Sequence, residues 1–529
     1  MPKKFIVVTG GVLSGIGKGI VAASISRLLN GYGLDVNVLK IDPYLNMDAG
    51  TMNPNQHGEV FVTDDGYEAD LDLGHYERFT GKDMSRKNNL TAGQVYYSVI
   101  SKERRGEYLG STVQVVPHVT EEIKNRIKSM EGELLVIEIG GTVGDIEGEV
   151  FFEAVRELSM ELGLDNFLFI HTTFVPYLGT TNEFKTKPTQ QSVQLLRRIG
   201  IQPNMIVVRT EFPIDPSSLD KISLFTGVSR NMVINLYDTK NVYEIPEILK
   251  EYNVHSKIAK FLNIELSGNF DWDYPKVFRP IKIALVGKYL GTDDAYKSII
   301  ESIFLCGVEK PRVVDSELLE EDGNPEEFLK GFDGIIIPGG FGKRGIEGKI
   351  KAITYARERR IPILGICLGM QLMVIEYFRN IVGFKEANST EFDPNTKYPV
   401  IDIMEEQKKV LNLGGTMRLG GQEMRIFPNT RLWKIYGELT EERERHRHRY
   451  EVNFDEFKEH FTIPNENSNE NNDEKKLVVS AMSDFVEAIE LNNHPFFVGV
   501  QFHPEYRSKV GNPHPVFAAL VKAIEKKLR

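Results

Sequence analysis

Short apolar runs alternate with longer amphipathic stretches through the first half of the chain. Short runs bounded by turn residues predict buried strands, and the amphipathic stretches between them predict helices. The predicted strands are residues 5–8, 36–41, 134–139, 167–170 and 205–208. Buried strands joined through helices pair in parallel, so this half predicts a doubly wound α/β domain with helices on both faces of a largely parallel sheet.

A second alternating series fills the C-terminal half, with apolar runs at residues 281–286, 334–337 and 361–366 that end in glycine-rich or small-residue turns. It predicts a second α/β domain, also doubly wound. The polar and aromatic stretch 267–275 between the two series is typical of a linker. We therefore expect domains at 1–266 and 281–529, joined by a linker at 267–280.

Composition supports two folded domains and narrows the classes of partner. A chain of 529 residues is too long for one ordinary core. A formal net charge of −11 argues against nucleic acid or an anionic membrane as the main partner. The first apolar run, 5–8, is too short for a signal peptide or a membrane span, which predicts a cytoplasmic protein. The polar, low-complexity segment 465–474 predicts an exposed, mobile loop without a catalytic role.

The chain has two cysteines, which excludes a disulfide framework and a cysteine-rich metal site. Cys306 ends an apolar run with helical periodicity and is interpreted as a buried core residue. Cys367 instead lies in Gly365-Ile366-Cys367-Leu368-Gly369, directly after a predicted strand and before a predicted helix. The glycines allow a sharp turn that exposes a nucleophile, and the helix N-terminus stabilises a thiolate. A tight turn around a buried thiol is the alternative.

Two further elements supply what a nucleophilic thiol needs. The apolar run 496–500 leads into Gln-Phe-His-Pro-Glu, which places His503 and Glu505 two residues apart at a strand end. One side chain can act as a base and the other can orient it, so Cys367, His503 and Glu505 form a candidate triad. A surface His-Pro turn is the alternative. The glycine-rich turn at 338–342 also follows a strand and could present N–H groups to an oxyanion.

In this order, Pro-Gly-Gly, Gly-x-Cys-x-Gly and His-Pro-Glu resemble the class I glutamine amidotransferases over residues 281–529. The resemblance implies that Cys367 attacks the glutamine amide, forms a thioester and releases ammonia. It also implies that glutamine or its oxyanion is bound by Gly340, Leu368, Gly369, Met370, Gln371, Glu391 and Arg449. Composition alone would make the run 445–451 around Arg449 a solvated basic stretch or a phosphate patch.

A glycine-rich loop follows the first predicted strand. Residues 9–19 read Thr-Gly-Gly-Val-Leu-Ser-Gly-Ile-Gly-Lys-Gly and lead into a helical run at 20–29. Backbone N–H groups and a helix N-terminus bind phosphate, and Lys18 reaches the terminal phosphates. Five residues rather than four separate Gly11 from Gly17, and Gly19 stands where the common phosphate loop has Ser or Thr. The usual magnesium hydroxyl is therefore missing.

Carboxylates would then have to hold the metal. Glu138, at the end of the strand 134–139, is one candidate, and Asp72 is the other. From the residues alone, Asp72 also fits an ordinary aspartate in a turn.

Five blocks, at residues 10–19, 40–44, 56–62, 70–78 and 185–190, resemble the signatures of the CTP synthase family, and the likeness spans nearly the whole chain. It implies binding of ATP and phosphate by Ser14, Gly15, Ile16, Gly17, Lys18, Gly19, Lys40 and Asp72. It implies magnesium at Asp72 and Glu138. It implies binding of UTP or CTP by Ser14, Asp145, Ile146, Glu147, Lys185, Thr186, Lys187, Pro188, Thr189, Gln190 and Lys221. Without the resemblance, the lysines near residue 185 would be assigned to a solvated loop.

The resemblance further implies ATP-dependent amination of UTP through a 4-phosphorylated intermediate, with ammonia passed internally from Cys367. It implies activation by GTP, feedback inhibition by CTP and a homotetramer. One rival is an ATP-dependent amidotransferase that acts on the carboxylates of a corrin precursor, but such an enzyme would lack the block 185–190. The other rival, a non-enzymatic nucleotide-binding scaffold, predicts loss of Cys367, His503 or Lys18, and all three are present.

Overall fold

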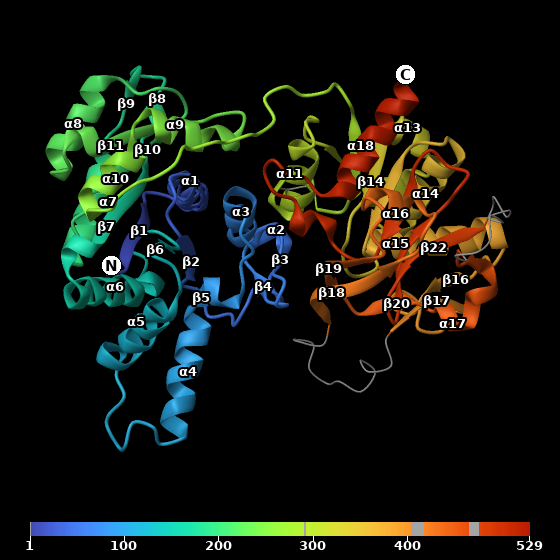
Figure 1. Ribbon diagram of the computed structural model, residues 1–529, viewed down its shortest axis with the longest axis horizontal. Coiled ribbons are helices and arrows are strands. Elements are labelled where there is room, and N and C mark those ends of the chain that lie inside the picture. Colours follow the sequence, from blue (N-terminus) through green and yellow to red (C-terminus); the bar gives the residue numbers. More distant parts are fainter. Residues whose placement is uncertain (1, 290–292, 404–416, 465–475) are drawn as a thin grey trace. The chain divides into compact units, whose positions relative to one another are not determined.

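The computed structural model describes residues 2–289, 293–403, 417–464 and 476–529 (Figure 1). The chain forms two compact units that interleave along the sequence. The first unit contains Met1–Ala49 and Asp72–Asp273, and the second contains Gly50–Leu71 and Tyr274–Arg529. The low-complexity segment 465–474 lies outside the described residues.

The first unit is built on a seven-stranded sheet in the order β11-β10-β7-β1-β6-β2-β5. Every pairing along this order is parallel. A small antiparallel hairpin of β8 (Tyr177–Leu178) and β9 (Glu183–Phe184) stands apart from it. All five predicted strands are present. The seven strands are β1 (Lys4–Gly11), β2 (Val36–Asp42), β5 (Asn89–Thr91), β6 (Leu134–Ile139), β7 (Phe167–Phe174), β10 (Met205–Thr210) and β11 (Val233–Tyr237).

Helices cover both faces of this sheet, as the alternating pattern predicts (Figure 1). On one face, side chains of α4 to α7 join Phe5, Leu39 and Ile137 in a continuous core. On the other face, α1 packs on β1, β2 and β6, and α10 packs on β7. The helices are α1 (Lys18–Gly31), α3 (Leu71–Thr80), α4 (Ala92–Arg104), α5 (Thr120–Ser129), α6 (Glu149–Leu162), α7 (Lys187–Arg198), α8 (Pro216–Thr226), α9 (Ile245–Glu251) and α10 (Val254–Leu262).

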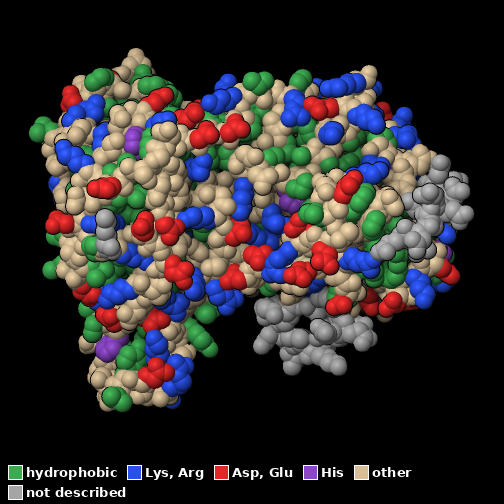
Figure 2. Space-filling view, in the orientation of Figure 1, with side chains coloured by type: hydrophobic (Ala, Val, Ile, Leu, Met, Phe, Trp, Pro, Cys, Tyr) green, Lys and Arg blue, Asp and Glu red, His purple; other side chains and the backbone are tan. Residues whose placement is uncertain are grey.

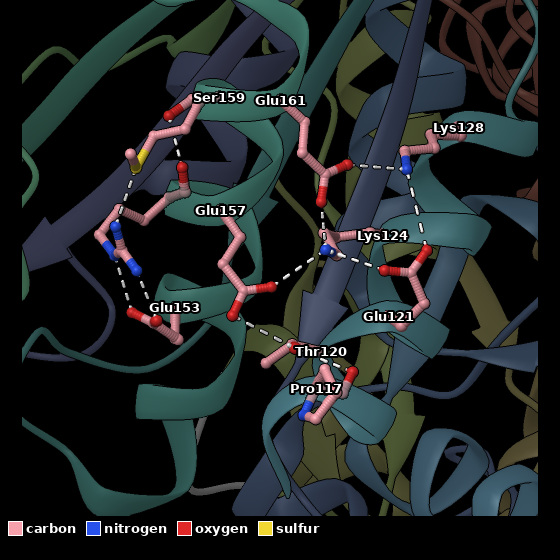
Figure 3. A network of polar contacts seen from close by, with 11 residues as sticks. Pro117, Thr120, Glu121, Lys124, Lys128, Glu153, Glu157, Ser159 and Glu161 are labelled. Atoms are coloured by element: carbon pink, nitrogen blue, oxygen red, sulfur yellow. Dashed lines mark hydrogen bonds and ion pairs between the residues drawn. The ribbon is translucent and has the colours of Figure 1, made fainter.

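An ion-pair network joins α5 to α6 (Figure 3). Lys124 lies 2.9 Å from a Glu121 oxygen and 3.0 Å from a Glu157 oxygen, and it also contacts Glu161. The Lys124 side chain is only 5% exposed. The surrounding carboxylates raise the pKa of Lys124 despite the opposing effect of burial, so this lysine stays charged.

The second unit contains a larger sheet, in the order β13-β12-β14-β15-β24-β23-β22-β18-β19. Strands β13 to β24 in this order are parallel, and antiparallel strands extend the sheet beyond β24. The strands are β12 (Ile283–Gly287), β13 (Arg312–Asp315), β14 (Gly334–Ile337), β15 (Ile363–Ile366), β18 (Arg418–Ile426), β19 (Glu441–His448), β22 (Leu477–Met482), β23 (Val486–Glu490) and β24 (Phe497–Val500). Strand β21 (Phe461–Thr462) pairs with β22, and a separate sheet contains β16 (Ala387–Ser389), β17 (Tyr398–Ile403) and β20 (Tyr450–Val452).

Helices again lie on both faces. One core joins α12 to α15 with Val286, Ile337 and Ile363, and the other joins α11 and α18 with Leu285, Ile336 and Leu364. Cys306 belongs to the second core, so its predicted burial is confirmed, and burial raises the pKa of its thiol to about 12. The helices are α11 (Lys297–Leu305), α12 (Ser316–Asp322), α13 (Pro325–Leu329), α14 (Ile346–Glu358), α15 (Leu368–Tyr377), α16 (Arg431–Ile435), α17 (Phe454–Phe457) and α18 (Pro515–Leu528).

An early segment of the chain, Gly50–Leu71, belongs to this second unit. It carries α2 (Pro54–His57) and a hairpin of β3 (Phe61–Val62) and β4 (Glu68–Ala69). The Glu59 carboxylate accepts hydrogen bonds from Ser298 N at 2.9 and 3.0 Å. Tyr506 Oη donates to Val60 O at 2.9 Å. These buried polar contacts attach the segment to the core of the second unit.

The surface mixes charges of both signs. On the face drawn in Figure 2, Lys and Arg side chains are interspersed with Asp and Glu over each unit. None of the helices in the described ranges combines the length and apolar content that a bilayer-spanning helix requires.

Candidate functional site

The glycine-rich loop connects β1 to α1, and its backbone explains its composition. Gly15 and Gly17 have φ values of 69° and 83°, in the left-handed region that favours glycine. Gly10 makes room for a side chain, because a Cβ there would lie 2.7 Å from Lys18 Cδ. Lys18 Nζ donates to Gly141 O at 2.6 Å, and burial lowers the pKa of Lys18. The loop therefore presents backbone N–H groups and a buried amine at the start of a helix.

Gly19, which departs from the common phosphate loop, faces Asp72. A Cβ at Gly19 would lie 2.1 Å from Asp72 Oδ1 and 2.7 Å from Asp72 Cγ. The Asp72 carboxylate thus fills the space that a Ser or Thr side chain would need. Asp72 is in the first turn of α3, so the interpretation as an ordinary turn aspartate is wrong.

Lys40 gathers the buried carboxylates of the first unit. Its Nζ contacts Asp72 and lies 3.0 Å from Glu138 Oε1 and 3.8 Å from Asp42 Oδ1. Burial raises the pKa of Glu138. Burial also opposes ionisation of Asp72, but Lys40 lowers the pKa of that carboxyl below its usual value. The result is a buried cluster of negative and positive charges beside the glycine-rich loop.

The oxygen donors of this cluster fit magnesium. Asp72 and Glu138 converge on one point, the Lys40 ammonium, and Tyr76 Oη donates to the second oxygen of Glu138. Over the described ranges, no group of at least three Asp, Glu, His or Cys residues has the arrangement of a metal site. Two carboxylates that leave the remaining positions to phosphate and water are the usual provision for Mg²⁺.

A cavity adjoins the glycine-rich loop and was not predicted from the sequence. It has a volume of about 270 Å³, and its walls include Ile16, Val21 and Leu236. Arg209, at its rim, donates to Asp238 Oδ1 at 2.9 Å and to Gly15 O at 3.2 Å. Its apolar walls and polar rim suit a flat heterocyclic base. The lining segment Leu236-Tyr237-Asp238-Thr239 begins within β11 and has no distinctive composition, so no sequence pattern marked this cavity.

A buried hydrogen-bond chain connects the loop strand to α7. Thr9 Oγ1 lies 2.8 Å from His171 Nδ1, and His171 Nε2 lies 3.0 Å from Ser192 Oγ. His171 is fully buried, and burial together with the charge of Lys18 lowers its pKa to about 3. The neutral ring therefore bridges β1 to the helix that begins with the block 187–190.

The residues expected to bind UTP or CTP differ in burial and in the elements that carry them. Thr189 and Gln190 are buried in the first turns of α7, whereas Lys185, paired with Glu183, and Lys221 on α8 are more exposed. Asp145 precedes a short 3-10 turn that contains Ile146 and Glu147. Ile146 and Glu147 line a cavity of about 530 Å³ with Pro43, Leu45, Ala92, Tyr96, Val115, Val116, Glu149, Val150 and Glu153, which includes none of the lysines.

In the second unit, Cys367 occupies the junction of β15 and α15. Its φ of 51° and ψ of −106° are rare for a residue with a side chain, and such strain typically costs about 1–3 kcal/mol. The flanking glycines serve close packing rather than the turn: a Cβ at Gly369 would lie 2.1 Å from Ile337 O, and one at Gly365 would lie 2.4 Å from Met373 Sδ. The turn that exposes the thiol is therefore made by Cys367 itself.

His503 and Glu505 meet this cysteine from the end of β24. His503 Nδ1 lies 2.7 Å from Glu505 Oε1, and both side chains are buried. Burial lowers the pKa of His503, but the Glu505 carboxylate and the charge of a Cys367 thiolate outweigh burial and raise the pKa to about 10. A Cβ on Gly339 would lie 3.0 Å from His503 Cε1 and 3.6 Å from Cys367 Cβ, so the glycine-rich turn passes both residues.

Cys367, His503 and Glu505 line one cavity of about 80 Å³ together with the turn residues Pro338 to Phe341. Pro54, Glu59 and Val60 supply part of its wall, although they come from the first seventy residues of the chain. Arg447, Tyr289, Tyr296 and Tyr506 also line it. Sequence reasoning missed these residues because nothing local connects them to Cys367.

Of the expected glutamine-binding residues, Gly340 lines this cavity, and the others are not part of its lining. Leu368, Gly369, Met370 and Gln371 form the first turn of α15. Gln371 Nε2 donates to Tyr450 O at 2.8 Å, and Glu391 Oε1 accepts from Gly342 N at 2.8 Å. Burial raises the pKa of Glu391, whereas Lys288 and Arg449 act in the opposite direction. Arg449 and Glu391 are thus electrostatic neighbours beside the turn that contains Gly340.

The interpretation of residues 445–451 as a solvated basic run is wrong. Arg445, His446 and His448 are buried in or beside β19. His446 Nδ1 lies 3.0 Å from His448 Nε2, and burial lowers the pKa of both rings well below the usual value. This strand brings the Arg447 carbonyl to 3.7 Å from Cys367 Sγ.

Comparisons with known proteins match both halves of the chain. The family model for the CTP synthase N-terminus matches residues 4–264, and the model for class-I glutamine amidotransferases matches residues 292–523. A CTP synthase of Thermotoga maritima is 69% identical over 526 residues and one of Thermosipho africanus is 67% identical over 525, each alignment covering 99% of both chains. The glutaminase domain of a Trypanosoma brucei CTPS with bound acivicin is 36% identical, with coverage of 46% of this chain and 94% of that one and a TM-score of 0.40.

Proposed function

This chain belongs to the CTP synthase family and is a glutamine-hydrolysing ligase that converts UTP to CTP; we propose that Cys367, His503 and Glu505 release the ammonia and that the glycine-rich loop and Lys40 cluster activate UTP. The observation that carries this assignment is the 2.7 Å contact of His503 with Glu505 in the cavity that also contains the strained Cys367. For the sequence domains we propose the limits 1–266 and 281–529, with 267–280 as linker.

In the glutaminase reaction, the Cys367 thiolate attacks the side-chain amide carbon of glutamine and forms a C–S bond. The negative charge that develops on the carbonyl oxygen is stabilised by N–H groups of Gly340 and Leu368. His503, protonated and oriented by Glu505, gives its proton to the amide nitrogen, so the C–N bond breaks and ammonia leaves. Water then hydrolyses the thioester to glutamate. The remaining expected residues, Gly369, Met370, Gln371, Glu391 and Arg449, shape the glutamine site.

In the synthetase reaction, the C4 oxygen of uracil must be activated because it is a poor leaving group. Transfer of the ATP γ-phosphoryl group to this oxygen converts it into phosphate, which ammonia displaces to form CTP. Residues 14–19 cradle the phosphates, and Lys18 and Lys40 neutralise the developing charge. The cavity bounded by Val21 and Leu236 is our candidate for the adenine base.

Asp72 and Glu138 would hold Mg²⁺, which would supply positive charge beside the transferred phosphate. In the structure, Lys40 contacts both carboxylates and fixes their orientation. The space that Asp72 takes beside Gly19 accounts for the missing hydroxyl ligand of the loop.

From the family assignment we propose a homotetramer, in which UTP, and CTP as feedback inhibitor, is bound by Lys185, Thr186, Lys187, Pro188, Thr189, Gln190, Lys221, Asp145, Ile146 and Glu147. Asp145 follows Gly144, where a Cβ would lie 3.2 Å from Leu195 Cδ1 on α7, the helix that begins at Lys187. Ile146 is 85% exposed, which leaves it accessible to another copy of the chain.

The family assignment also supports GTP as an activator and a cytoplasmic location. It supports no role for nucleic acid or a membrane, in line with the acidic net charge of −11. The hypothesis of a corrin-precursor amidotransferase has no comparable support, because curated CTP synthases align over nearly the whole chain.

The test uses two variants of the complete enzyme. Cys367→Ala should abolish CTP synthesis from glutamine and leave synthesis from ammonia intact, because only the nitrogen source is lost. Lys18→Ala should stop synthesis with either source while basal glutamine hydrolysis persists. Loss of both activities in Cys367→Ala, in a variant that still folds, would contradict the proposed division of labour.

A further inference from the structure

Lys349 is a buried lysine beside the proposed nucleophile, and none of the chemistry described above uses it. It lies on α14, and its side chain is 1% exposed. Its Nζ donates to Pro338 O at 3.3 Å and would lie 4.0 Å from a Cβ built on Gly340. Pro338 and Gly340 line the Cys367 cavity, whereas Lys349 does not. The amine therefore contacts the glycine-rich turn from outside the cavity.

The electrostatic surroundings of Lys349 point to Cys367. On the helices packed against α14, three carboxylates are paired with arginines: Glu317–Arg344 at 3.3 Å, Glu326–Arg359 at 3.2 Å and Glu376–Arg357 at 2.8 Å. Two charged groups act on Lys349: Lys288, which follows β12, and the Cys367 thiolate, which precedes α15. Burial first, and then repulsion from Lys288, lower the pKa of Lys349 to about 7, while the thiolate acts to raise it.

We propose that Lys349 is a positioning residue of the glutaminase, whose ammonium fixes the Pro338 carbonyl and stabilises the Cys367 thiolate across the glycine-rich turn. The inference rests on the proposed role of Cys367 as nucleophile. Lys288, whose Nζ donates to Phe341 O, holds the other end of the same turn. The two lysines thus hold the turn at the carbonyls of Pro338 and Phe341.

Burying an ammonium group that has no carboxylate partner lowers the stability of a fold. Methionine has a similar length and fills the same space without the cost of desolvating a charge. A protonated lysine instead provides a positive electrostatic field. This field is strong in a dry interior, and it stabilises the thiolate and the oxyanion formed at the same turn. Deprotonation of the amine near neutral pH removes this benefit, so the field depends on pH.

The experiment compares Lys349→Met and Lys349→Gln in the full-length enzyme, with Lys351→Met as the matched control. Lys351 is on the same helix, but it donates to Leu319 O and Glu320 O, away from the turn. The main measurement is the rate at which iodoacetamide alkylates Cys367 as a function of pH, with mass spectrometry to separate Cys367 from Cys306. Glutaminase kcat/KM, ammonia-dependent CTP synthesis and urea unfolding are measured alongside.

Both Lys349 variants should raise the pH midpoint of alkylation by about one unit and lower kcat/KM for glutamine roughly tenfold at neutral pH. Lys349→Met should be at least as stable as the wild type, and ammonia-dependent synthesis should be unchanged. Lys351→Met should match the wild type in the alkylation profile.

Two results would overturn the proposal. The first is an unshifted alkylation midpoint in either folded variant. The second is normal behaviour of Lys349→Gln beside an impaired Lys349→Met, which would show that only the hydrogen bond matters. Alkylation of the wild-type enzyme distinguishes these results from a failure of the proposed function. If complete alkylation of Cys367 leaves glutamine hydrolysis intact, Cys367 is not the nucleophile.

Discussion

Replacing Gly19 with serine restores the residue that the common phosphate loop uses as a magnesium ligand, yet we expect the change to impair the enzyme. The new Cβ would lie 2.1 Å from Asp72 Oδ1, whereas ordinary contacts begin at 3.4 Å, so the carboxylate must retreat by more than about 1 Å. Asp72 then leaves Lys40, whose side chain is only 6% exposed.

The size of the effect follows from these contacts. Overpacking costs about 1–3 kcal/mol, and breaking a buried ion pair costs about 3–5 kcal/mol. The Asp72 side chain is 20% exposed and Lys40 keeps Glu138 at 3.0 Å, so the ion pair is only partly buried and we take about 3 kcal/mol in all, the lower limit for breaking a buried pair. If the whole cost falls on the step that needs Asp72 and Lys40, the rate drops by roughly 100-fold.

The assay is ammonia-dependent CTP synthesis, with basal glutamine hydrolysis as an internal control that should not change. Gly179→Ser is the matched variant, because a Cβ there meets nothing within 4 Å. A Gly19→Ser enzyme that makes CTP from ammonia at the wild-type rate would refute the reasoning, since Asp72 would then not be needed where the structure places it.

Three other changes test separate parts of the structure. Glu505→Gln should lower the pKa of His503 from about 10. A raised histidine pKa stabilises the folded state at pH values below the unfolded-state pKa of about 6.5. The loss in unfolding free energy, roughly 2 kcal/mol, should therefore be largest at about pH 5–6.5 and shrink towards pH 10. A stability difference that grows with pH would contradict this assignment. Lys124→Met should cost about 1 kcal/mol at low salt, less at high salt, and leave both activities unchanged in enzyme assays. His171→Phe removes the ring nitrogens from two buried hydroxyls, which keep the carbonyls of Ile170 and Thr189 as partners, and should cost about 1–2 kcal/mol in urea unfolding; an equally stable variant would show that the bridge is unimportant.

The strands and the motifs at the candidate sites were predictable because both are local properties of the chain. An apolar run between turn residues marks a buried strand wherever it packs, which is why β1, β2, β6, β7 and β10 were all identified. The glycine-rich loop and the Cys367 turn were recognisable for the same reason, since their spacing is written within about ten consecutive residues.

Local patterns misled where burial decided the answer. Arg445, His446 and His448 look like a solvated run, but they are buried although β19 is the last strand of its sheet. Asp72 looks like a turn residue, but it begins a helix whose position beside Gly19 depends on the packing of α3. Segments rich in charged residues resemble surface segments in composition, even where the charged side chains are buried with their partners.

The sequence by itself predicted two α/β folds, a candidate phosphate-binding loop and a candidate thiol nucleophile with its histidine and carboxylate, because each motif consists of neighbouring residues. Only the tertiary structure brought Glu59 and Val60 to the wall of the Cys367 cavity and Lys349 to the back of its turn. These contacts join segments far apart in the chain, and their energies come from burial and from charges in a dry interior. Those quantities exist only once the chain has folded.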